Sequence, residues 1–113
     1  MNKIFYISGP MEGYKDNNYE AFHNMAMDLE KLGYQYFNPH DIDCDEDYLI
    51  TENPTRQDYY RKDIRVLTYC NAIMMLKGWQ VSHGALFERQ VAIELGLTVH
   101  YEEEIEDGKL NFR

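Results

Sequence analysis

The stretch K-I-F-Y-I-S-G-P, residues 3–10, decides how the fold of this chain begins. Four apolar or aromatic residues lie between Lys3 and Ser8, and Gly9-Pro10 follows at once as a turn signal. A short continuous run of this kind, closed by a turn, is typical of a strand that is buried on both faces. We therefore expect a buried strand over Lys3–Ser8.

Helix-like and strand-like patterns alternate along the rest of the chain. The expected helices span about 18–32, 55–69 and 83–95, and the further expected strands span 34–38, 72–76 and 97–101. Asn17 or Asn18 can cap the first helix and Ser82 the last, while Gly33 and Gly96 follow the ends of these two helices. The pattern therefore reads β-α-β-α-β-α-β.

This order of elements predicts a three-layer α/β fold. Alternating strands and helices favour a mainly parallel sheet of four or five strands with helices on both faces. The length of 113 residues fits a single domain over residues 1–113. The acidic stretch 40–54 is predicted to be a loop, and Asp107-Gly108 a hairpin turn between two short final strands.

The charge of the chain excludes some partners. The chain has 11 basic and 20 acidic residues, a formal charge of 11 − 20 = −9, and half of the acids lie in the clusters 41–47 and 102–107. Such a chain repels phosphate backbones, which argues against nucleic-acid polymers as partners. The second cluster is expected to be a solvated edge.

Nothing in the sequence points to a membrane or to an oxidising compartment. No apolar run approaches the roughly 18–20 residues of a membrane span. Gly9-Pro10 comes too early for a signal peptide. Two cysteines, Cys44 and Cys70, are too few for a disulfide scaffold, and Cys70 is expected to be a small buried apolar residue. We therefore expect a cytoplasmic protein.

Three loops are candidates for a ligand site, because ligands of parallel α/β sheets bind beyond the carboxyl ends of the strands. These loops span residues 8–17, 39–53 and 77–84. The first, S-G-P-M-E-G from Ser8, has glycines that permit close backbone approach to a ligand. It matches neither of the known glycine-rich phosphate motifs, so an ordinary turn between strand and helix is the alternative.

Glu88 is the first candidate for chemistry. Gly84 and Glu88 are four residues apart and share one face of the last expected helix. The missing side chain of Gly84 leaves space into which Glu88 is expected to project, and the helix start stabilises its negative charge. The alternative is a solvated surface glutamate, but the apolar residues around Glu88 in the sequence argue against it.

Asp63 is a second candidate carboxylate. It lies beside Ile64, at the edge of the apolar side that Tyr60, Ile64 and Leu67 are expected to form on the middle helix. From there it can point to the same edge of the sheet as Glu88. The alternative is a structural salt bridge with Lys62 or another nearby base.

Four motifs together resemble the nucleoside 2-deoxyribosyltransferase-like superfamily. They are I-F-Y-I-S-G-P-M-E-G from residue 4, F-N-P from residue 37, D-I-R-V-L-T-Y-C-N-A-I-M-M-L-K-G-W from residue 63, and S-H-G-A-L-F-E-R-Q-V-A-I-E-L-G from residue 82. S-x-G-x-x-x-E followed by A-x-x-L-G is the most specific part, and the resemblance covers about residues 3–100. It is strongest to short phage and bacterial members, with a layout that the nucleoside 5′-monophosphate N-glycosidases share.

The resemblance implies a fold, an assembly and a role for each matching residue. The fold would be flavodoxin-like, and the assembly a homodimer or a dimer of dimers in the cytoplasm of a bacterium or an infected host cell. Glu88 matches the nucleophile that attacks C1′ of deoxyribose, Asp63 the aspartate that acts on the leaving base, and Tyr6 a strand tyrosine near the nucleophile. The matching substrate-binding positions are Ser8, Gly9, Pro10, Met11 and Gly13 in the first loop, and Ser82 and Gly84 at the 5′ end of the ligand.

The chemistry suits these roles. Cleavage of an N-glycosidic bond passes through an oxocarbenium-like state, which a carboxylate can stabilise or trap as a covalent intermediate. A second group eases departure of the base by giving it a proton. Either water or another base then accepts the sugar, so a small nucleoside or nucleotide is the expected partner and no metal or cofactor is required. A non-catalytic nucleotide-binding or sensing protein and a structural protein are the alternatives.

Two residues depart from the pattern of the superfamily. Glu12 stands where the monophosphate hydrolases have a basic residue, and its carboxylate would repel a 5′-phosphate. Asn71 stands where aspartate is frequent, which would alter the choice of base if this position touches the base or Asp63.

Two further features of the sequence have more than one interpretation. Trp79 either walls the ligand site and stacks on a base, or covers an edge of the sheet. The acids Asp41, Asp43, Asp45 and Glu52 resemble part of a calcium loop, but Glu46 stands where such a loop requires glycine, so a solvated loop is preferred.

Overall fold

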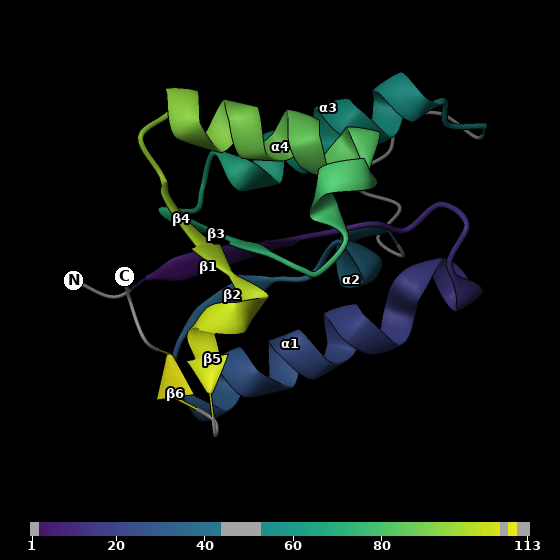
Figure 1. The fold of residues 1–113 in the computed structure, drawn as a ribbon. Helices are drawn as coiled ribbons and strands as arrows, with labels where there is room; N and C mark the ends of the chain where they lie inside the picture. The colour runs from purple at the N-terminus through teal and green to yellow at the C-terminus, as the bar shows by residue number, and fades with distance from the viewer. Residues whose placement is uncertain (1–2, 44–52, 107–108, 111–113) are drawn as a thin grey trace.

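A parallel four-stranded sheet forms the centre of the molecule in the computed structural model, which describes residues 3–43, 53–106 and 109–110. The strands are β1 (Ile4–Ser8), β2 (Gln35–Phe37), β3 (Ala72–Met75) and β4 (Thr98–Tyr101). They pair in the order β2-β1-β3-β4, and every pair is parallel (Figure 1). This confirms the predicted parallel sheet and gives it the strand order of the flavodoxin-like folds.

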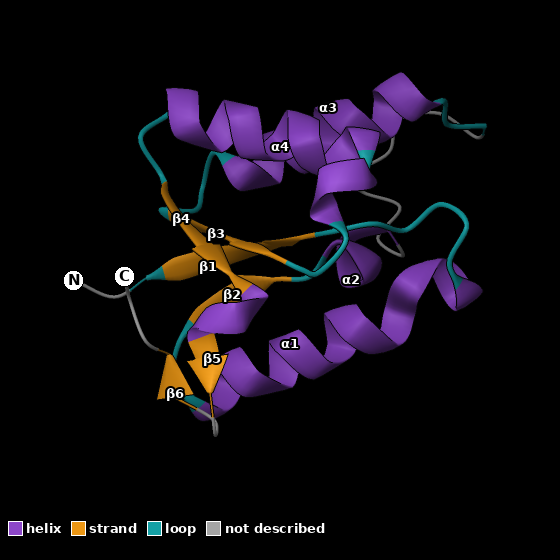
Figure 2. Cartoon of the chain, viewed as in Figure 1, coloured by secondary structure: helices purple, strands orange, loops and turns teal. Residues whose placement is uncertain are grey.

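Helices cover both faces of this sheet. Helix α1 (Tyr19–Lys31) lies on one face, and α3 (Arg56–Leu67) and α4 (His83–Glu94) lie on the other (Figures 1 and 2). The three predicted layers are confirmed. The single-turn helices η1 (Lys15–Asn18) and η3 (Trp79–Val81) lie in the loops that precede α1 and α4.

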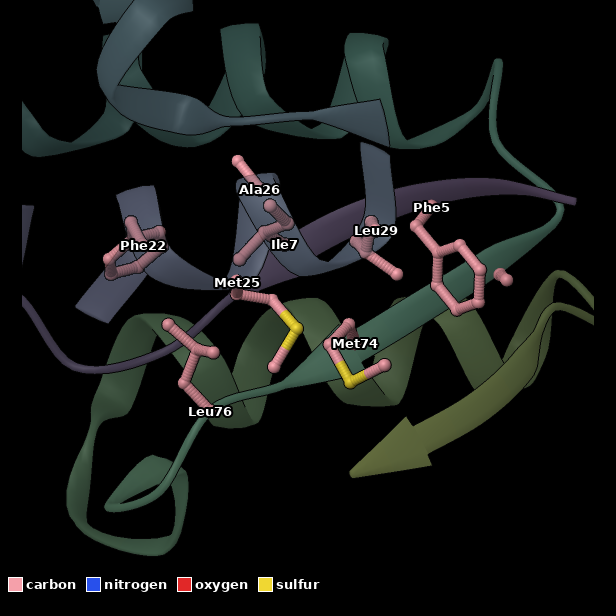
Figure 3. Packing of buried hydrophobic residues seen from close by; sticks show 9 residues of the cluster. Phe5, Ile7, Phe22, Met25, Ala26, Leu29, Met74 and Leu76 are labelled. Atoms are coloured by element: carbon pink, nitrogen blue, oxygen red, sulfur yellow. The ribbon is translucent and has the colours of Figure 1, made fainter. Parts of the chain in front are cut away.

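The alternating side chains of β1 serve two separate cores. Phe5 and Ile7 are fully buried against α1, in a cluster with Phe22, Leu29 and other apolar residues of α1 and β3 (Figure 3). Tyr6 points to the opposite face and packs in the cluster that α3 and α4 share with β3. Because side chains of a strand alternate between faces, Ser8 lies on the same face as Tyr6.

The start of α1 differs from the prediction in its capping. Asn18 precedes the helix, but its side chain caps no helical N–H and instead donates a hydrogen bond of 2.9 Å to the carbonyl oxygen of Pro10. Asp16, Asn17 and Asn18 all have left-handed backbone conformations. Asn18 therefore fixes the first loop to the helix rather than capping the helix.

The predicted loop 40–54 is wrong at its beginning. Residues Pro39–Asp43 form a short helix, α2, and the residues 44–52 lie outside the described part. The side chain of Asn38 accepts a hydrogen bond of 3.0 Å from the backbone N–H of His40, and Pro39 occupies the first helical position. Both are recognised start signals of a helix, so the sequence contained the information for α2.

The apolar side of α3 also differs from the prediction. Lys62, Val66 and Leu67 are buried, whereas Tyr60 and Ile64 are only partly buried. A lysine at the centre of the buried side hides the true periodicity, because the pattern counts lysine as polar. Thr55 caps the helix: its hydroxyl accepts from the Asp58 N–H at 3.2 Å, and its own N–H donates to the Asp58 carboxylate at 2.9 Å.

The chain after β4 is partly ordered by a buried acid. Glu104 is 7% exposed, accepts a hydrogen bond of 2.7 Å from the Tyr101 N–H, and lies 3.1 Å from the Nδ1 atom of His100. The prediction of a solvated edge is therefore wrong for Glu104. The backbones of β5 (Ile105–Glu106) and β6 (Lys109–Leu110) pair antiparallel as predicted, in a small separate sheet.

Within residues 3–43, 53–106 and 109–110, no helix has both the length and the apolar character needed to cross a membrane. Cys70 is buried, as predicted, and burial raises the pKa of its thiol to about 12.

We expect the cap of α3 to contribute to the stability of the fold. Replacement Thr55→Ala removes the hydroxyl that accepts from the Asp58 N–H, and should lower the free energy of unfolding by about 1 kcal/mol. Urea unfolding monitored by circular dichroism measures this loss. Gln57→Ala, at an exposed position in the same turn, is the control. Equal effects of the two substitutions would contradict the role of the cap.

Candidate active site

The topology points to one edge of the sheet as a candidate ligand site. The chain passes from β1 to β2 on one side of β1, and then from β2 across to β3 on its other side. The carboxyl ends of β1 and β3 therefore lie at the point where the strand order reverses, which is where open α/β sheets bind ligands. Ser8 ends β1, and the loop that leads to α4 follows β3.

Glu88 lies in this region and is held by two hydroxyl groups. The Tyr6 hydroxyl donates to its Oε2 atom at 2.7 Å, and the Ser8 hydroxyl donates to its Oε1 atom at 2.6 Å. Tyr6 and Ser8 are almost fully buried, and Glu88 is 7% exposed. The alternative of a solvated surface glutamate is therefore wrong.

The local sequence of α4 explains why Glu88 points inward. Ser82 caps the helix, since its hydroxyl accepts from the Ala85 N–H at 3.2 Å, as predicted. Ala85, Glu88 and Ala92 are three or four residues apart and form the buried side of the helix. The two alanines bring α4 close to the sheet, so the longer side chain between them reaches β1.

Asp63 belongs to the same buried cluster. Its Oδ1 atom lies 3.4 Å from the Nζ atom of Lys62, and its negative charge acts on both Glu88 and Tyr6. Its side chain is 15% exposed, whereas Lys62 is fully buried. Asp63 thus forms the salt bridge with Lys62 and also lies close enough to Glu88 for its charge to act on that group.

Burial changes the acidity of all three charged groups. Burial, and then the negative charge of Asp63, raises the pKa of Glu88 to about 8, although hydrogen bonds from Ser8 and Tyr6 and the charge of Lys62 oppose this shift. Burial also raises the pKa of Asp63, against the effect of Lys62, and burial lowers the pKa of Lys62. Carboxyl groups with raised pKa values are suited to exchange protons near neutral pH.

The residues of the first loop differ in what they contact. Gly9 packs so closely that a Cβ atom there would lie 2.7 Å from the Cβ atom of Leu76. Pro10 is buried, and Met11 packs against the cluster on the α1 side of the sheet. Gly13 has a φ of +84° with open space around it, as a turn requires. The loop is therefore anchored at Gly9, Pro10 and Met11, and Gly13 lies at its exposed turn.

The space beside Gly84, in the first turn of α4, is bordered by an aromatic ring. A Cβ atom on Gly84 would lie 3.7 Å from the ring of Tyr60, an ordinary contact distance. The Tyr60 ring also packs on Phe87, with centroids 5.3 Å apart, and on His83, at 6.3 Å. Tyr60 therefore packs over the first turns of α4, a contact that the sequence did not indicate.

Trp79 packs at the β4 side of the sheet. Its ring centroid lies 5.7 Å from that of Tyr101, and the Arg89 guanidinium stacks on it at 4.8 Å. The same guanidinium donates to the Tyr101 hydroxyl at 2.9 Å. These contacts favour the interpretation that Trp79 covers an edge of the sheet.

The two departures from the superfamily pattern lie in different parts of the molecule. Glu12 is strongly exposed, and its carboxylate pairs with Arg56 of α3 at 3.6 Å. The side chain of Asn71 accepts a hydrogen bond of 2.7 Å from the Ile4 N–H, at the amino end of β1. Because this is the opposite edge of the sheet from Ser8, Asn71 does not contact the base or Asp63 in this site.

No group of three or more potential metal ligands occurs among residues 3–43, 53–106 and 109–110. Asp45, Glu46 and Glu52 of the calcium alternative lie outside the described residues.

Comparison with known proteins gives one matching family and several solved structures of related fold, among them two 2-deoxyribosyltransferases. Residues 3–101 match the family model described as a domain of unknown function (DUF4406). A search of curated proteins gives no match in sequence. Among solved structures, the 2-deoxyribosyltransferase of Bacillus psychrosaccharolyticus matches with a TM-score of 0.68 and 14% identity, over 87% of this chain and 70% of the other. The 2-deoxyribosyltransferase of Leishmania mexicana matches with a TM-score of 0.64 and 20% identity, over 96% of this chain and 77% of the other.

These matches confirm the flavodoxin-like fold expected from the resemblance.

The raised pKa of Glu88 predicts a pH-dependent stability. The folded state keeps a proton on Glu88 up to about pH 8, whereas the unfolded chain releases it near its ordinary value of 4.5. Glu88 therefore stabilises the fold below pH 4.5, and this contribution is lost as the pH rises through 8. As the pH rises from 5 to 9, the free energy of unfolding of Glu88→Gln should increase relative to that of wild type by on the order of 2–4 kcal/mol.

Urea unfolding at several pH values measures this difference. Glu94→Gln, on the same helix but exposed, is the matched control and should give no pH-dependent gain. A constant difference between Glu88→Gln and wild type across this range would contradict the buried acid.

Proposed function

We propose that this chain, which belongs to the DUF4406 family, breaks the N-glycosidic bond of a 2-deoxynucleoside or of its 5′-monophosphate and passes the sugar to water or to another base. One observation carries the proposal: a buried carboxylate at the switch point of the sheet, oriented by two hydroxyl donors, with a second carboxyl group beside it. The shared fold with two 2-deoxyribosyltransferases supports the same class of reaction.

In the first step, an oxygen of Glu88 attacks C1′ while the bond from C1′ to the base nitrogen breaks. Each carboxylate oxygen has two lone pairs, so the hydrogen bonds from Tyr6 and Ser8 leave one lone pair on each oxygen free for C1′. The two hydroxyls also fix the orientation of the carboxylate, which lowers the entropic cost of reaching the transition state. The negative charge of Glu88 stabilises the positive charge that develops on the sugar ring.

Asp63 serves the leaving base in the same step. The electron pair of the broken bond stays on the base, which leaves more easily when it receives a proton. Asp63 is buried next to Glu88, and its pKa is raised, so it can carry a proton at a pH where an exposed aspartate has lost its own. Glu88 is the other carboxyl group of the pair with Asp63. Its ionised form accepts hydrogen bonds from the hydroxyls of Tyr6 and Ser8.

The second step releases the sugar. Water attacks C1′ of the ester at Glu88 and yields free deoxyribose, or the nitrogen of another base attacks and yields a new nucleoside. The incoming group loses a proton to Asp63, and Glu88 leaves as a carboxylate. The chain supplies acid, base and nucleophile from its own side chains, and the identity of the acceptor decides between hydrolase and transferase.

The direct test is release of base from a panel of substrates. We expect chromatography to detect free base from at least one 2-deoxynucleoside or its 5′-monophosphate, with and without an added acceptor base. Glu88→Ala and Glu88→Gln should each lower the rate by about 10³-fold or more, because they remove the nucleophile. Glu94→Gln is the matched control on the same helix.

Two results would decide against this proposal. If no substrate of the panel releases base, the chain is a nucleotide-binding protein of the same fold or a structural protein, and ligand binding by calorimetry separates these two alternatives. If Glu88→Gln turns over at the wild-type rate, Glu88 is not the nucleophile.

The acidity of Glu88 predicts the pH profile of the reaction. Only ionised Glu88 attacks C1′, and the pKa of Glu88 is about 8 in the ligand-free protein. For a substrate whose leaving group departs without a proton, such as 4-nitrophenyl 2-deoxyriboside, the value of kcat/KM should therefore rise about tenfold per pH unit well below pH 8 and level off above it. Initial rates between pH 5.5 and 9.5 measure this limb. A flat profile between pH 6 and 9 would contradict it.

A further inference from the structure

Lys62 is a fully buried lysine that the reaction as described does not use. Its side chain has no exposed surface, although it projects from the middle of a helix whose neighbouring residues Arg61 and Arg65 are exposed. A lysine is almost never fully buried without charged partners, because removing an ammonium group from water costs several kcal/mol. Its position therefore depends on the groups that surround it.

The surroundings of Lys62 belong to the candidate site. Its Nζ atom lies 3.4 Å from Asp63 Oδ1 and 5.0 Å from the centroid of the Tyr59 ring, both on α3. Glu88 of α4 acts on its charge from across the site. Tyr6 of β1 faces Glu88 and Asp63 and is itself neutral. With Lys62 protonated and both acids ionised, the cluster has a net charge of −1.

We propose that Lys62 is a positioning residue of this site, whose ammonium group orients the Asp63 carboxylate and supplies, through it, the proton that the leaving base takes up. The inference rests on the glycosidic reaction proposed above. It assigns the proton of the first step to a pair of adjacent residues rather than to Asp63 alone.

The step balances in atoms and charge. As the bond from Glu88 to C1′ forms, the bond from C1′ to the base nitrogen breaks, and its electron pair stays on the base. Lys62 gives its proton to the ionised Asp63, which passes a proton to that nitrogen and ends as a carboxylate again. The products are a glycosyl ester at Glu88, a neutral base and a neutral Lys62 amine, so the net charge stays at −1. The proton returns to Lys62 through Asp63 when water or the acceptor base attacks.

The acidities of the pair support this transfer. Burial lowers the pKa of Lys62 and raises the pKa of Asp63, so the two values approach one another. A proton then passes between the two groups at a smaller cost in free energy than between an exposed lysine and an exposed aspartate. The distance of 3.4 Å between Nζ and Oδ1 provides the path.

The test compares two substrates that differ in their need for a proton. Deoxyadenosine has a poor leaving group that requires protonation, whereas 4-nitrophenyl 2-deoxyriboside releases a stable anion. Lys62→Arg keeps the positive charge but holds its proton too tightly to release it. We expect Lys62→Arg to lower kcat for deoxyadenosine by about 10²-fold. The loss of kcat for the nitrophenyl substrate should be about tenfold or less.

Arg61→Met is the matched control, since it removes an exposed cation from the preceding position of the same helix. It should affect both substrates equally and weakly. Unfolding in urea first establishes that each variant is folded. A loss with Lys62→Arg that is equal for the two substrates overturns the inference. Wild-type protein that cleaves neither these two substrates nor any member of the panel overturns the proposed function itself.

A second measurement does not depend on turnover. The carboxyl carbon of Asp63, assigned by its absence in Asp63→Asn, is titrated by ¹³C NMR in ligand-free wild type and in Lys62→Met. Loss of the ammonium should move the titration of Asp63 to higher pH by about one unit or more. If Asp63 titrates at the same pH in both proteins, Lys62 does not act on it, and the inference is wrong whether or not the chain is an enzyme.

Discussion

The arrangement of the site depends on the burial of one carboxylate, that of Glu88. A carboxylate that is only 7% exposed is tolerated in a protein interior when donors replace the water it has lost. Here both donors come from a single strand, because Tyr6 and Ser8 are two residues apart and a strand repeats its orientation every second residue. These two donors lie on β1, the neighbour of β3 at the switch point, so α4 must approach β1 closely for Glu88 to reach them. Ala85 and Ala92 allow that approach.

The same burial opposes the stability of the fold. At neutral pH, two acids and a lysine occupy space on the α3 and α4 side of the sheet where apolar side chains would pack without loss of hydration. On the opposite face, Phe5, Phe22 and Leu29 are fully buried in an apolar layer (Figure 3). The buried pair of His100 and Glu104 lies beside this layer, with the His100 ring 5.4 Å from that of Phe5. Both faces of the sheet thus bury ionisable groups, but only the α3 and α4 side places two acids and a lysine together.

The local sequence contained most of the fold and only part of the site. Apolar runs and helical spacing predicted the four strands and the three long helices, since these signals are local. The inward position of Glu88 followed from its spacing with Gly84 and from its apolar neighbours. The contact of Glu88 with Ser8 joins residues 80 positions apart, which no local pattern encodes. Lys62 was missed for a different reason, because a periodicity argument assigns every lysine to the solvent side. The condition attached to Asn71 is not met, because its side chain binds the Ile4 N–H at the amino end of β1.

Asp63 illustrates why a structural and a functional interpretation of one residue need not compete. A salt bridge with Lys62 seemed to be the alternative to a role in the site, yet a second acid beside buried Glu88 would be strongly disfavoured without a nearby cation. The ion pair is therefore the condition under which Asp63 can stand next to Glu88 at all. The net charge of the whole chain does not describe the site. The charge of −9 arises largely from two clusters along the sequence, whereas in the site one lysine balances one of two acids. The character of the candidate site at the switch point depends on these three groups and on the two hydroxyls of β1.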